Sequence, residues 1–247
     1  MSLQKIHKAK PLVHCITNYV VTNFTANGLL TVGASPVMAD AIEEVAEMAS
    51  KADALCLNIG TLNERTIQSM LAAGQSAHEH GIPIVLDPVG AGSTSFRTQI
   101  TLTLLQQLQV SLIRCNIGEL AAIAGVNWQA KGVDSGSGEL DVVQTAQMIA
   151  NTYNCFVVVT GAEDVLTDGQ TVEVITGGHE KITKVTGSGC LLSALCAAML
   201  ASSSEPLLDL KNLLREYKQI GSSAFAQMGT FHENFFNYLE QFAEGRQ

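Results

Sequence analysis

The sequence has few charged residues, few aromatic residues and no long apolar run, and each shortage excludes a class of protein. Charged residues make up 15% of the 247 residues and aromatic residues 5%, whereas 47% are hydrophobic. This hydrophobic fraction excludes an intrinsically disordered chain, which combines low hydrophobicity with high net charge. No segment approaches the roughly 20 consecutive apolar residues of a membrane span. The polar residues 1–10 lack the apolar region of a secretory signal, so we expect a cytoplasmic protein.

Basic residues are scarce as well. The chain has 14 Lys and Arg against 23 Asp and Glu, which gives a net charge of −9. Nucleic acids and anionic membranes both attract basic surfaces. We therefore expect no nucleic-acid partner and no membrane partner, although one local positive site could still bind a nucleotide.

The sequence contains no C-x-x-C pair and no histidines at metal-ligand spacing from its cysteines. Most of its six cysteines lie in apolar segments. We expect reduced thiols rather than a disulfide framework, and surface imidazoles rather than a metal site.

Strand-like and helix-like segments alternate through most of the chain. Short apolar runs predict strands, and apolar residues at helical spacing predict helices. The predicted strands are 54–60, 82–87, 111–115 and 155–160, and the predicted helices are 63–80, 96–107, 118–124 and 138–151. Apolar strands alternating with helices are typical of a parallel sheet covered on both faces. We expect an α/β fold in a single domain, residues 1–247.

Two parts of the chain depart from this alternation. Asp168-Gly169, between two short apolar runs, predicts a late antiparallel hairpin over 164–175. The remaining chain predicts helices over 188–203, 208–228 and 231–244. A linker-like stretch, 131–138, is too short to separate domains.

A glycine-rich segment, Thr186-Gly187-Ser188-Gly189-Cys190, opens the first of these helices. Its glycines allow close approach of a ligand, and the unpaired amides of a helix start favour an anion such as a phosphate. An ordinary turn into a buried helix fits the same residues equally well. The chain has no Gly-Lys-Ser/Thr, so the segment is not a Walker loop.

Cys190 lies in the first turn of this helix, where the helix dipole lowers the pKa of a thiol. Three roles remain open from the residues alone. The thiol could be a nucleophile, a general base or a small packing residue.

Polar residues also follow other predicted strands, at the sheet edge where α/β proteins bind ligands. Asp87 suits a carboxylate facing a ligand or its metal ion, or the cap of a turn. Arg114 offers a planar fork for phosphate oxygens. Asn116 and Glu119 could hold hydrated Mg²⁺, or form the capping box of a helix. Thr160 could meet a nucleotide or merely end a strand. Together these groups suit phosphoryl transfer.

Several longer strings, in the same order and with the same spacing, resemble the hydroxyethylthiazole kinase family. They are His14–Asn18, Val21–Asn27, Gly33–Ala39, Leu86–Gly92, Phe96–Thr98, Val159–Gly161 and Val185–Cys190. The resemblance covers residues 11–201 and implies a ribokinase-like fold, a three-layer α/β/α sandwich. It also implies phosphorylation of the primary hydroxyl of 4-methyl-5-(2-hydroxyethyl)thiazole, with ATP and Mg²⁺, in thiamine biosynthesis or salvage. Members are typically cytoplasmic homotrimers with the thiazole site at a subunit interface.

The resemblance also implies roles for single residues. The anion hole beside the transferred phosphate matches Gly187, Ser188 and Gly189, and Cys190 matches a position where ribokinase-like kinases more often carry an Asp base. The metal–phosphate network matches Asp87 and Glu119. Nucleotide-binding positions match Arg114, Thr160 and Asn116, and the thiazole-binding region matches Asn18, Met38 and Gly187.

The family's usual Arg-Gly-Asn is not fully kept. Cys115 replaces the Gly, and Gly118 stands where Ser or Ala is common. If the backbone passes close to the phosphates, Cys115 adds a side chain beside them.

Three rival interpretations remain at this point. The first is a kinase for another small alcohol of pyrimidine or pyridoxal type. The second is a hydrolase with Cys190 as nucleophile and no need for ATP, and the third is a non-catalytic nucleotide-sensing module. The string from Ile16 to Met38 favours the thiazole kinase, because neither the hydrolase nor the sensor requires it.

Overall fold

The computed structural model describes the whole chain except residues 127–128, 132–133, 138–139, 225–226, 228 and 247. Its strands are β1 (Leu12–Ile16), β2 (Ser35–Val37), β3 (Ala54–Asn58), β4 (Ile84–Asp87), β5 (Leu112–Asn116), β6 (Gln129–Lys131), β7 (Asp134–Ser137), β8 (Phe156–Thr160), β9 (Asp164–Thr167) and β10 (Val172–Ile175). Its helices are α1 (Ser2–Ala9), α2 (Thr22–Thr31), α3 (Val45–Lys51), α4 (Glu64–Glu79), α5 (Ser95–Gln107), α6 (Ile117–Ile123), α7 (Val142–Tyr153), the 3₁₀ helix η1 (Glu180–Lys184), α8 (Ser188–Ser202), α9 (Pro206–Ser223) and α10 (Phe231–Glu244).

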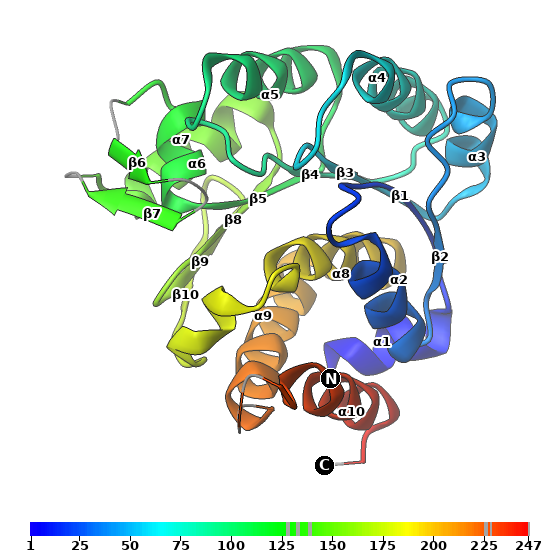
Figure 1. Cartoon of the computed structure of the whole chain (residues 1–247), viewed down its shortest axis with the longest axis vertical. Helices are drawn as coiled ribbons and strands as arrows, with labels where there is room; N and C mark the ends of the chain where they lie inside the picture. Colours follow the sequence, from blue (N-terminus) through cyan, green and yellow to red (C-terminus); the bar gives the residue numbers. More distant parts are fainter. Residues whose placement is uncertain (127–128, 132–133, 138–139, 225–226, 228, 247) are drawn as a thin grey trace.

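Eight strands form one sheet in the order β10-β9-β8-β5-β4-β3-β1-β2. Neighbours from β2 to β8 are parallel, and β9 and β10 are antiparallel to their neighbours. Helices α3 to α7 cover one face of the sheet, and α1, α2 and α8 to α10 cover the other (Figure 1). The predicted α/β/α sandwich, with its mostly parallel sheet and late antiparallel hairpin, is confirmed.

The apolar core has two parts, one on each face of the sheet, because successive strand residues point to opposite faces. Cys15, Cys56 and Leu112 pack on the face that carries α8, whereas Leu57 and Cys115 pack on the other. Helix α8 is buried from Leu191 to Met199. This burial fixes the start of α8 firmly against the sheet.

Some predicted boundaries were wrong for local reasons. Helix α7 begins at Val142 rather than 138, because the Asp141 side chain accepts a hydrogen bond from the Gln144 amide and caps the helix. Helix α9 ends at Ser223 rather than 228. The linker-like stretch forms the small β6–β7 sheet instead, although residues 132–133 and 138 lie outside the described part.

The cysteines are free thiols as predicted, but one histidine is buried rather than exposed. All six cysteines are free thiols, and five of them are buried. His14, expected at the surface, is buried instead and bonds the Ala39 carbonyl through Nε2 at 2.7 Å. Within the described ranges, no helix has the length and apolar character to cross a bilayer.

Candidate active site

Polar residues gather where parallel strands end, at one edge of the sheet. Asn58 ends β3 and lies opposite Asp87, which ends β4. Asn116 ends β5 and lies opposite Thr160, which ends β8. The strand register therefore brings together residues that are up to 102 positions apart in the sequence, as expected at this edge of an α/β sheet.

A chain of hydrogen bonds links the ends of β1, β3 and β4 with α8. The Asn18 amide donates to Asn58 Oδ1 at 2.9 Å and to Cys190 Sγ at 3.6 Å. The Asn58 amide in turn donates to Asp87 Oδ2 at 2.8 Å, and the Ser193 hydroxyl donates to the same oxygen at 2.9 Å. These contacts fix the orientation of the Asp87 carboxylate.

Among the described residues, the second oxygen of Asp87 has no hydrogen-bond partner, although the carboxylate is fully buried. The nearest cation is Arg114, whose Nη1 lies 3.9 Å from Asp87 Oδ1. Burial raises the pKa of Asp87, and this effect outweighs the opposing charge of Arg114. An unpartnered buried oxygen of this kind is costly and suits a site that a ligand or metal ion completes.

Arg114 lies directly under the first turn of α8. A Cβ atom on Gly189 would come within 2.5 Å of Arg114 Nη1 and 2.9 Å of Nη2. The Arg114 Nη2 group also donates a hydrogen bond to the Thr160 hydroxyl. The absence of a side chain at Gly189 thus leaves room for the guanidinium group beside the N-terminus of α8. The guanidinium and the helix N-terminus both favour binding of an anion.

Asn116 and Glu119 form the capping box of α6. The Asn116 side chain accepts from the Glu119 amide, and Glu119 Oε2 accepts from the Asn116 amide at 2.8 Å. Glu119 Oε1 accepts from the Gly90 amide, also at 2.8 Å. Burial, together with the charge of Asp87, raises the pKa of Glu119 to about 7. The structural interpretation of this pair is confirmed, and Glu119 still lies beside the Asp87–Arg114 pair.

The glycine-rich segment forms a turn and then the start of α8. Gly187 has φ +96° and precedes the first helical residue. The Ser188 amide donates to the Val185 carbonyl at 3.2 Å, so it is already used inside the turn. The amides of Gly189 and Cys190 precede the first helical bond, from Leu191 to the Gly187 carbonyl. These two amides are therefore better candidates for the predicted anion hole than the Ser188 amide, which is already bonded.

The expectation of a lowered thiol pKa at Cys190 was wrong. Burial, with the nearby charge of Asp87, raises the pKa of Cys190 to about 12. Desolvation of the thiolate therefore outweighs the helix dipole. At neutral pH Cys190 is a thiol, so it is neither a ready nucleophile nor a ready base.

We expect Cys190 to resist alkylation in the native protein. With a pKa of about 12, only about one thiol in 10⁴ is ionised at pH 8. Native protein treated with iodoacetamide at pH 8 should stay unmodified at Cys190, as peptide mass mapping would show. The same protein in denaturant, where the cysteines are solvated, is the control and should be modified throughout. Rapid native modification of Cys190 would contradict the raised pKa.

Cys115 and Met38 lie apart from the residues around Asp87 and Arg114. Cys115 is fully buried in the core on the face opposite α8, so its side chain points away from Arg114 and Gly189. Met38 follows β2 at the edge of the sheet, half-buried against the α8 side of the core. The structure thus brings together Asn18, Asp87, Arg114 and the start of α8, with Met38 two strands away from β3.

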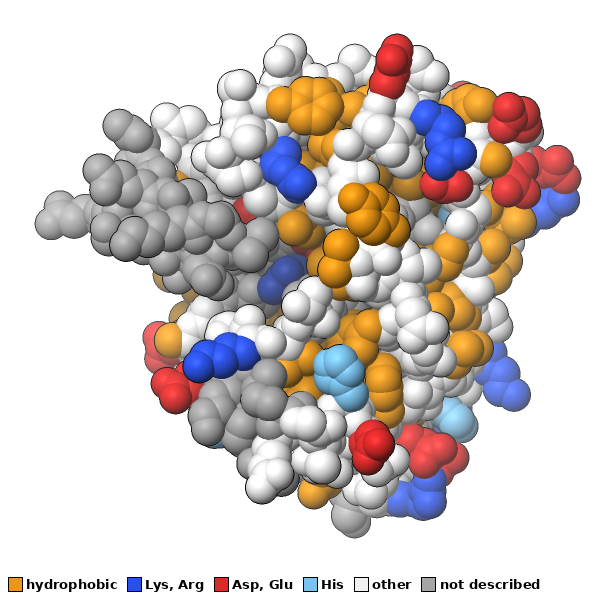
Figure 2. Space-filling model, viewed as in Figure 1, with side chains coloured by type: hydrophobic (Ala, Val, Ile, Leu, Met, Phe, Trp, Pro, Cys, Tyr) orange, Lys and Arg blue, Asp and Glu red, His pale blue; other side chains and the backbone are white. Residues whose placement is uncertain are grey.

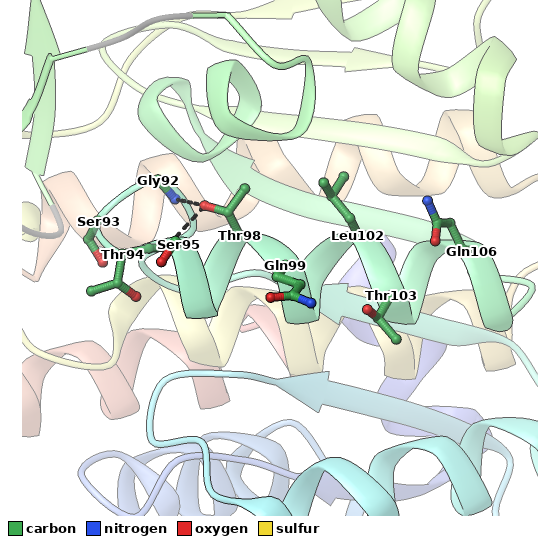
Figure 3. A pocket seen from close by; sticks show the side chains of 9 residues that line it. All are labelled: Gly92, Ser93, Thr94, Ser95, Thr98, Gln99, Leu102, Thr103 and Gln106. Atoms are coloured by element: carbon green, nitrogen blue, oxygen red, sulfur yellow. Dashed lines mark hydrogen bonds between the residues drawn. The ribbon is translucent and has the colours of Figure 1, made fainter.

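A shallow hollow of about 740 Å³ runs along α5, outside this group of residues (Figure 3). Serine, threonine and glutamine side chains line most of it. None of the predicted site residues does, and we do not place the active site there.

Sequence reasoning missed two residues that contact the site residues directly. Asn58 has the same signal that singled out Asp87, because it is a polar residue at the end of an apolar strand. Ser193 is a polar residue within an otherwise apolar buried helix. Either signal could have placed these residues beside Asp87.

Comparisons with known proteins identify relatives of this chain. A model of the "Hydroxyethylthiazole kinase family" matches residues 3–245. The chain is 53% identical to the hydroxyethylthiazole kinase of Lysinibacillus sphaericus, over 92% of this chain and 89% of that protein. A solved structure of the hydroxyethylthiazole kinase protein from Pyrococcus horikoshii has a TM-score of 0.87 and 40% identity, and the match covers 97% of this chain and 91% of that one.

A more distant structure supports the expected fold class. A ribokinase-like superfamily protein from Enterococcus faecalis matches with a TM-score of 0.67 at 11% identity, over 94% of this chain and 87% of that one. At this identity the match shows the fold alone, which is ribokinase-like as expected. Family membership follows from two stronger observations, which are the match of the family model over nearly the whole chain and the 53% identity. This chain belongs to the hydroxyethylthiazole kinase family.

Proposed function

We propose that the protein transfers the terminal phosphoryl group of ATP to the primary hydroxyl of 4-methyl-5-(2-hydroxyethyl)thiazole, in thiamine biosynthesis or salvage. The observation that carries this proposal is the placement of Arg114 and the first amides of α8 side by side. This arrangement suits the charge that spreads over a phosphoryl group during its transfer. Family membership supports the thiazole alcohol as the acceptor.

In this proposal the nucleotide and the alcohol approach the start of α8 from opposite sides. Arg114, Asn116 and Thr160 would bind the nucleotide phosphates at the ends of β5 and β8. Asn18 and Met38 would bind the thiazole on the β1–β2 side, with Gly187 against it. The amides of Gly189 and Cys190 would then stabilise the phosphoryl group between the two substrates.

Cys190 would position the hydroxyl rather than deprotonate it. Its pKa of about 12 keeps the thiol protonated, and Asn18 donates a hydrogen bond to its sulfur. Phosphoryl transfer through a loose transition state needs little base catalysis, because positioning and charge stabilisation supply most of the rate. A protonated thiol beside the anion hole is compatible with such a reaction.

The carboxylates present fit Mg²⁺, which prefers oxygen ligands and keeps several waters. Asp87 has one buried oxygen that forms no hydrogen bond with any described residue, and Glu119 lies beside this carboxylate. Both Glu119 oxygens accept backbone amides, which favours contact with the metal through water. Within the described residues, no cluster of three or more His, Cys, Asp or Glu side chains could hold a metal ion. Mg²⁺ would neutralise the phosphate charge.

The acceptor can be tested with a panel of alcohols. We expect kcat/KM for hydroxyethylthiazole to exceed that for hydroxymethylpyrimidine and for pyridoxal by at least about tenfold, the discrimination that a few fitted contacts give. The measurement is ATP-dependent product formation under identical conditions. A higher kcat/KM for either of the other two alcohols would reject the thiazole as the main substrate.

We further propose a cytoplasmic homotrimer of single-domain chains, with each thiazole site at a subunit interface. Tyr19 and Val20, directly after Asn18, are 80% and 62% exposed. Figure 2 shows hydrophobic side chains at several separate places on one face of the molecule, with polar groups between them. Exposed apolar residues beside a binding residue support a neighbouring subunit at that place.

We expect Tyr19→Asp to break the trimer, because it would place a charge in an apolar interface. Light scattering after gel filtration should give three times the 26.2 kDa chain mass for the wild type and one chain mass for the variant. Met148→Asp is a matched control, because Met148 is 51% exposed but lies on α7, in the other helical layer. A monomeric wild type, or a trimeric Tyr19→Asp variant, would contradict the proposal.

A further inference from the structure

Lys218 of α9 places its ammonium group among four oxygens from two separate segments, residues 161–164 and Gly177. Its Nζ lies 3.2 Å from the Gly161 carbonyl, 3.2 Å from the Ala162 carbonyl and 3.3 Å from the Gly177 carbonyl. It lies 3.1 Å from the Asp164 carboxylate. An ammonium group has three donor hydrogens, so these four oxygens share them.

This oxygen cage is almost closed to solvent. Lys218 is 9% exposed and Asp164 is 4% exposed. Asp164 Oδ1 also accepts the Gly161 amide at 3.0 Å, which closes the turn between β8 and β9. A buried lysine is rare unless it is paired and hydrogen-bonded. Lys218 therefore acts as a fixed cation that holds the surrounding carbonyls together.

The segments joined in the cage flank the proposed nucleotide site. Gly161 and Ala162 directly follow Thr160, whose hydroxyl accepts a hydrogen bond from Arg114. Gly177 belongs to the segment that leads from β10 to η1 and α8. The cage thus connects the turn after Thr160 with the chain that runs toward the anion hole.

Helix α9 contacts the same region at two more positions. The hydroxyl of Tyr217, the residue before Lys218, donates to the Ser188 carbonyl at the start of α8, with a distance of 2.5 Å. Gly221, one turn later, leaves room for Ile182 of η1, which a Cβ atom would approach to 2.8 Å. One face of α9 therefore supports the turn after β8, η1 and the first residue of α8.

We propose that Lys218 is a positioning residue for the nucleotide, acting as a tethered cation that sets the turn after Thr160 relative to the start of α8. This inference rests on the proposed function of the same site. It assigns Lys218 to the nucleotide side alone, because the cage contains no residue from the β1–β2 side, where the thiazole would bind.

The first test separates the two substrates. Lys218→Met keeps the length and apolar stem of the side chain but removes the cation. The KM for ATP should rise about tenfold, because loss of the cation would displace the groups that bind the nucleotide. The KM for the thiazole should stay within about twofold of the wild-type value. Lys211→Met is the matched control, because Lys211 lies two turns earlier on α9 and pairs with Glu173 at 2.6 Å, outside the cage. It should change neither constant.

The second test restores the cation. Lys218→Ala removes the ammonium donor that the four oxygens share, so ammonium chloride should recover part of the lost ATP affinity. Tetramethylammonium chloride at the same ionic strength, which cannot donate hydrogen bonds, should recover none. Lys218→Arg covers the case in which the other variants fail to fold. Its planar fork does not match four converging oxygens, so we expect a raised KM for ATP despite the retained charge.

Two results would overturn the inference. One is an unchanged KM for ATP in folded Lys218→Met, or in Lys218→Arg where the other variants do not fold. The other is an equal rise in both KM values, which indicates a general structural role. Failure of the proposed function gives a different result, which is measured on the wild-type protein. If the wild type forms no phosphorylated thiazole, the proposed function is wrong, whatever the Lys218 variants show.

Discussion

Gly189→Ala is expected to remove most of the kinase activity without loss of stability. The new Cβ would lie 2.5 Å from Arg114 Nη1, 2.9 Å from Nη2 and 3.0 Å from Cζ, so the guanidinium must leave its place under α8. We expect kcat/KM to fall on the order of 10²-fold, as for a misplaced group in an active site. Stability should be kept, because alanine favours a helix over glycine by about 0.5–1 kcal/mol.

The measurement is kcat/KM together with the thermal midpoint of unfolding, Tm. Gly229→Ala is the control, because a Cβ at Gly229 meets no atom of the described residues within 4 Å. It should leave kcat/KM unchanged. A Gly189→Ala protein with wild-type kcat/KM would reject the placement of the phosphoryl group between Arg114 and α8.

Gly187 is less suited to this test, although it lies two residues earlier. Its φ of +96° strains any other residue, and a Cβ would lie 2.9 Å from Phe24 Cδ1 and 3.1 Å from Val21 Cγ1. A Gly187→Val variant should therefore lose stability as well as activity. Only the Gly189 variant separates the two effects.

Asp87→Asn is expected to lower turnover on the order of 10²–10³-fold, the loss typical of removing one preorganised electrostatic group. The variant keeps an oxygen that can accept from Asn58 and Ser193, but it has no charge for a metal ion or for Arg114. Two effects on stability oppose each other, because the variant avoids a buried charge and also deprives Arg114 of a partner. We expect Tm to move by less than about 4 °C.

The decisive readout is the dependence of turnover on Mg²⁺ concentration. The midpoint of this titration should shift to higher Mg²⁺ in Asp87→Asn. Asp141→Asn is the matched control, because Asp141 caps α7 away from the site and asparagine caps helices equally well. An unchanged Mg²⁺ titration in Asp87→Asn would rule out the proposed role of Asp87 in metal binding.

The sequence predicted the sheet from β3 to β10, because its buried parallel strands are short apolar runs with polar residues at their ends. It did not predict β1 and β2, which form one edge of the sheet. The same regularity predicts that Asp87, Arg114 and Thr160 lie at one edge of the sheet, since each of them stands at the end of such a run. The covering of the sheet on both faces followed from the alternation of strands and helices, and the antiparallel hairpin followed from Asp168-Gly169.

Other features depend on contacts between distant residues, which local patterns do not carry. The thiol pKa of Cys190 is set by burial and by Asp87, 103 residues away in the chain, rather than by the helix dipole alone. The direction of Cys115 depends on which face of β5 it occupies. Lys218 gave no sequence signal, because its four oxygen partners come from two other segments, both more than 40 residues away in the chain.

The measurement that tests the account most directly is ADP release by the wild-type protein with ATP, Mg²⁺ and hydroxyethylthiazole, coupled to mass spectrometry of the product. The account predicts ADP release that depends on the thiazole, and a product heavier than the alcohol by one phosphoryl group. ATP binding by calorimetry with no phosphorylated thiazole would contradict the account and would favour another alcohol or a nucleotide-sensing role.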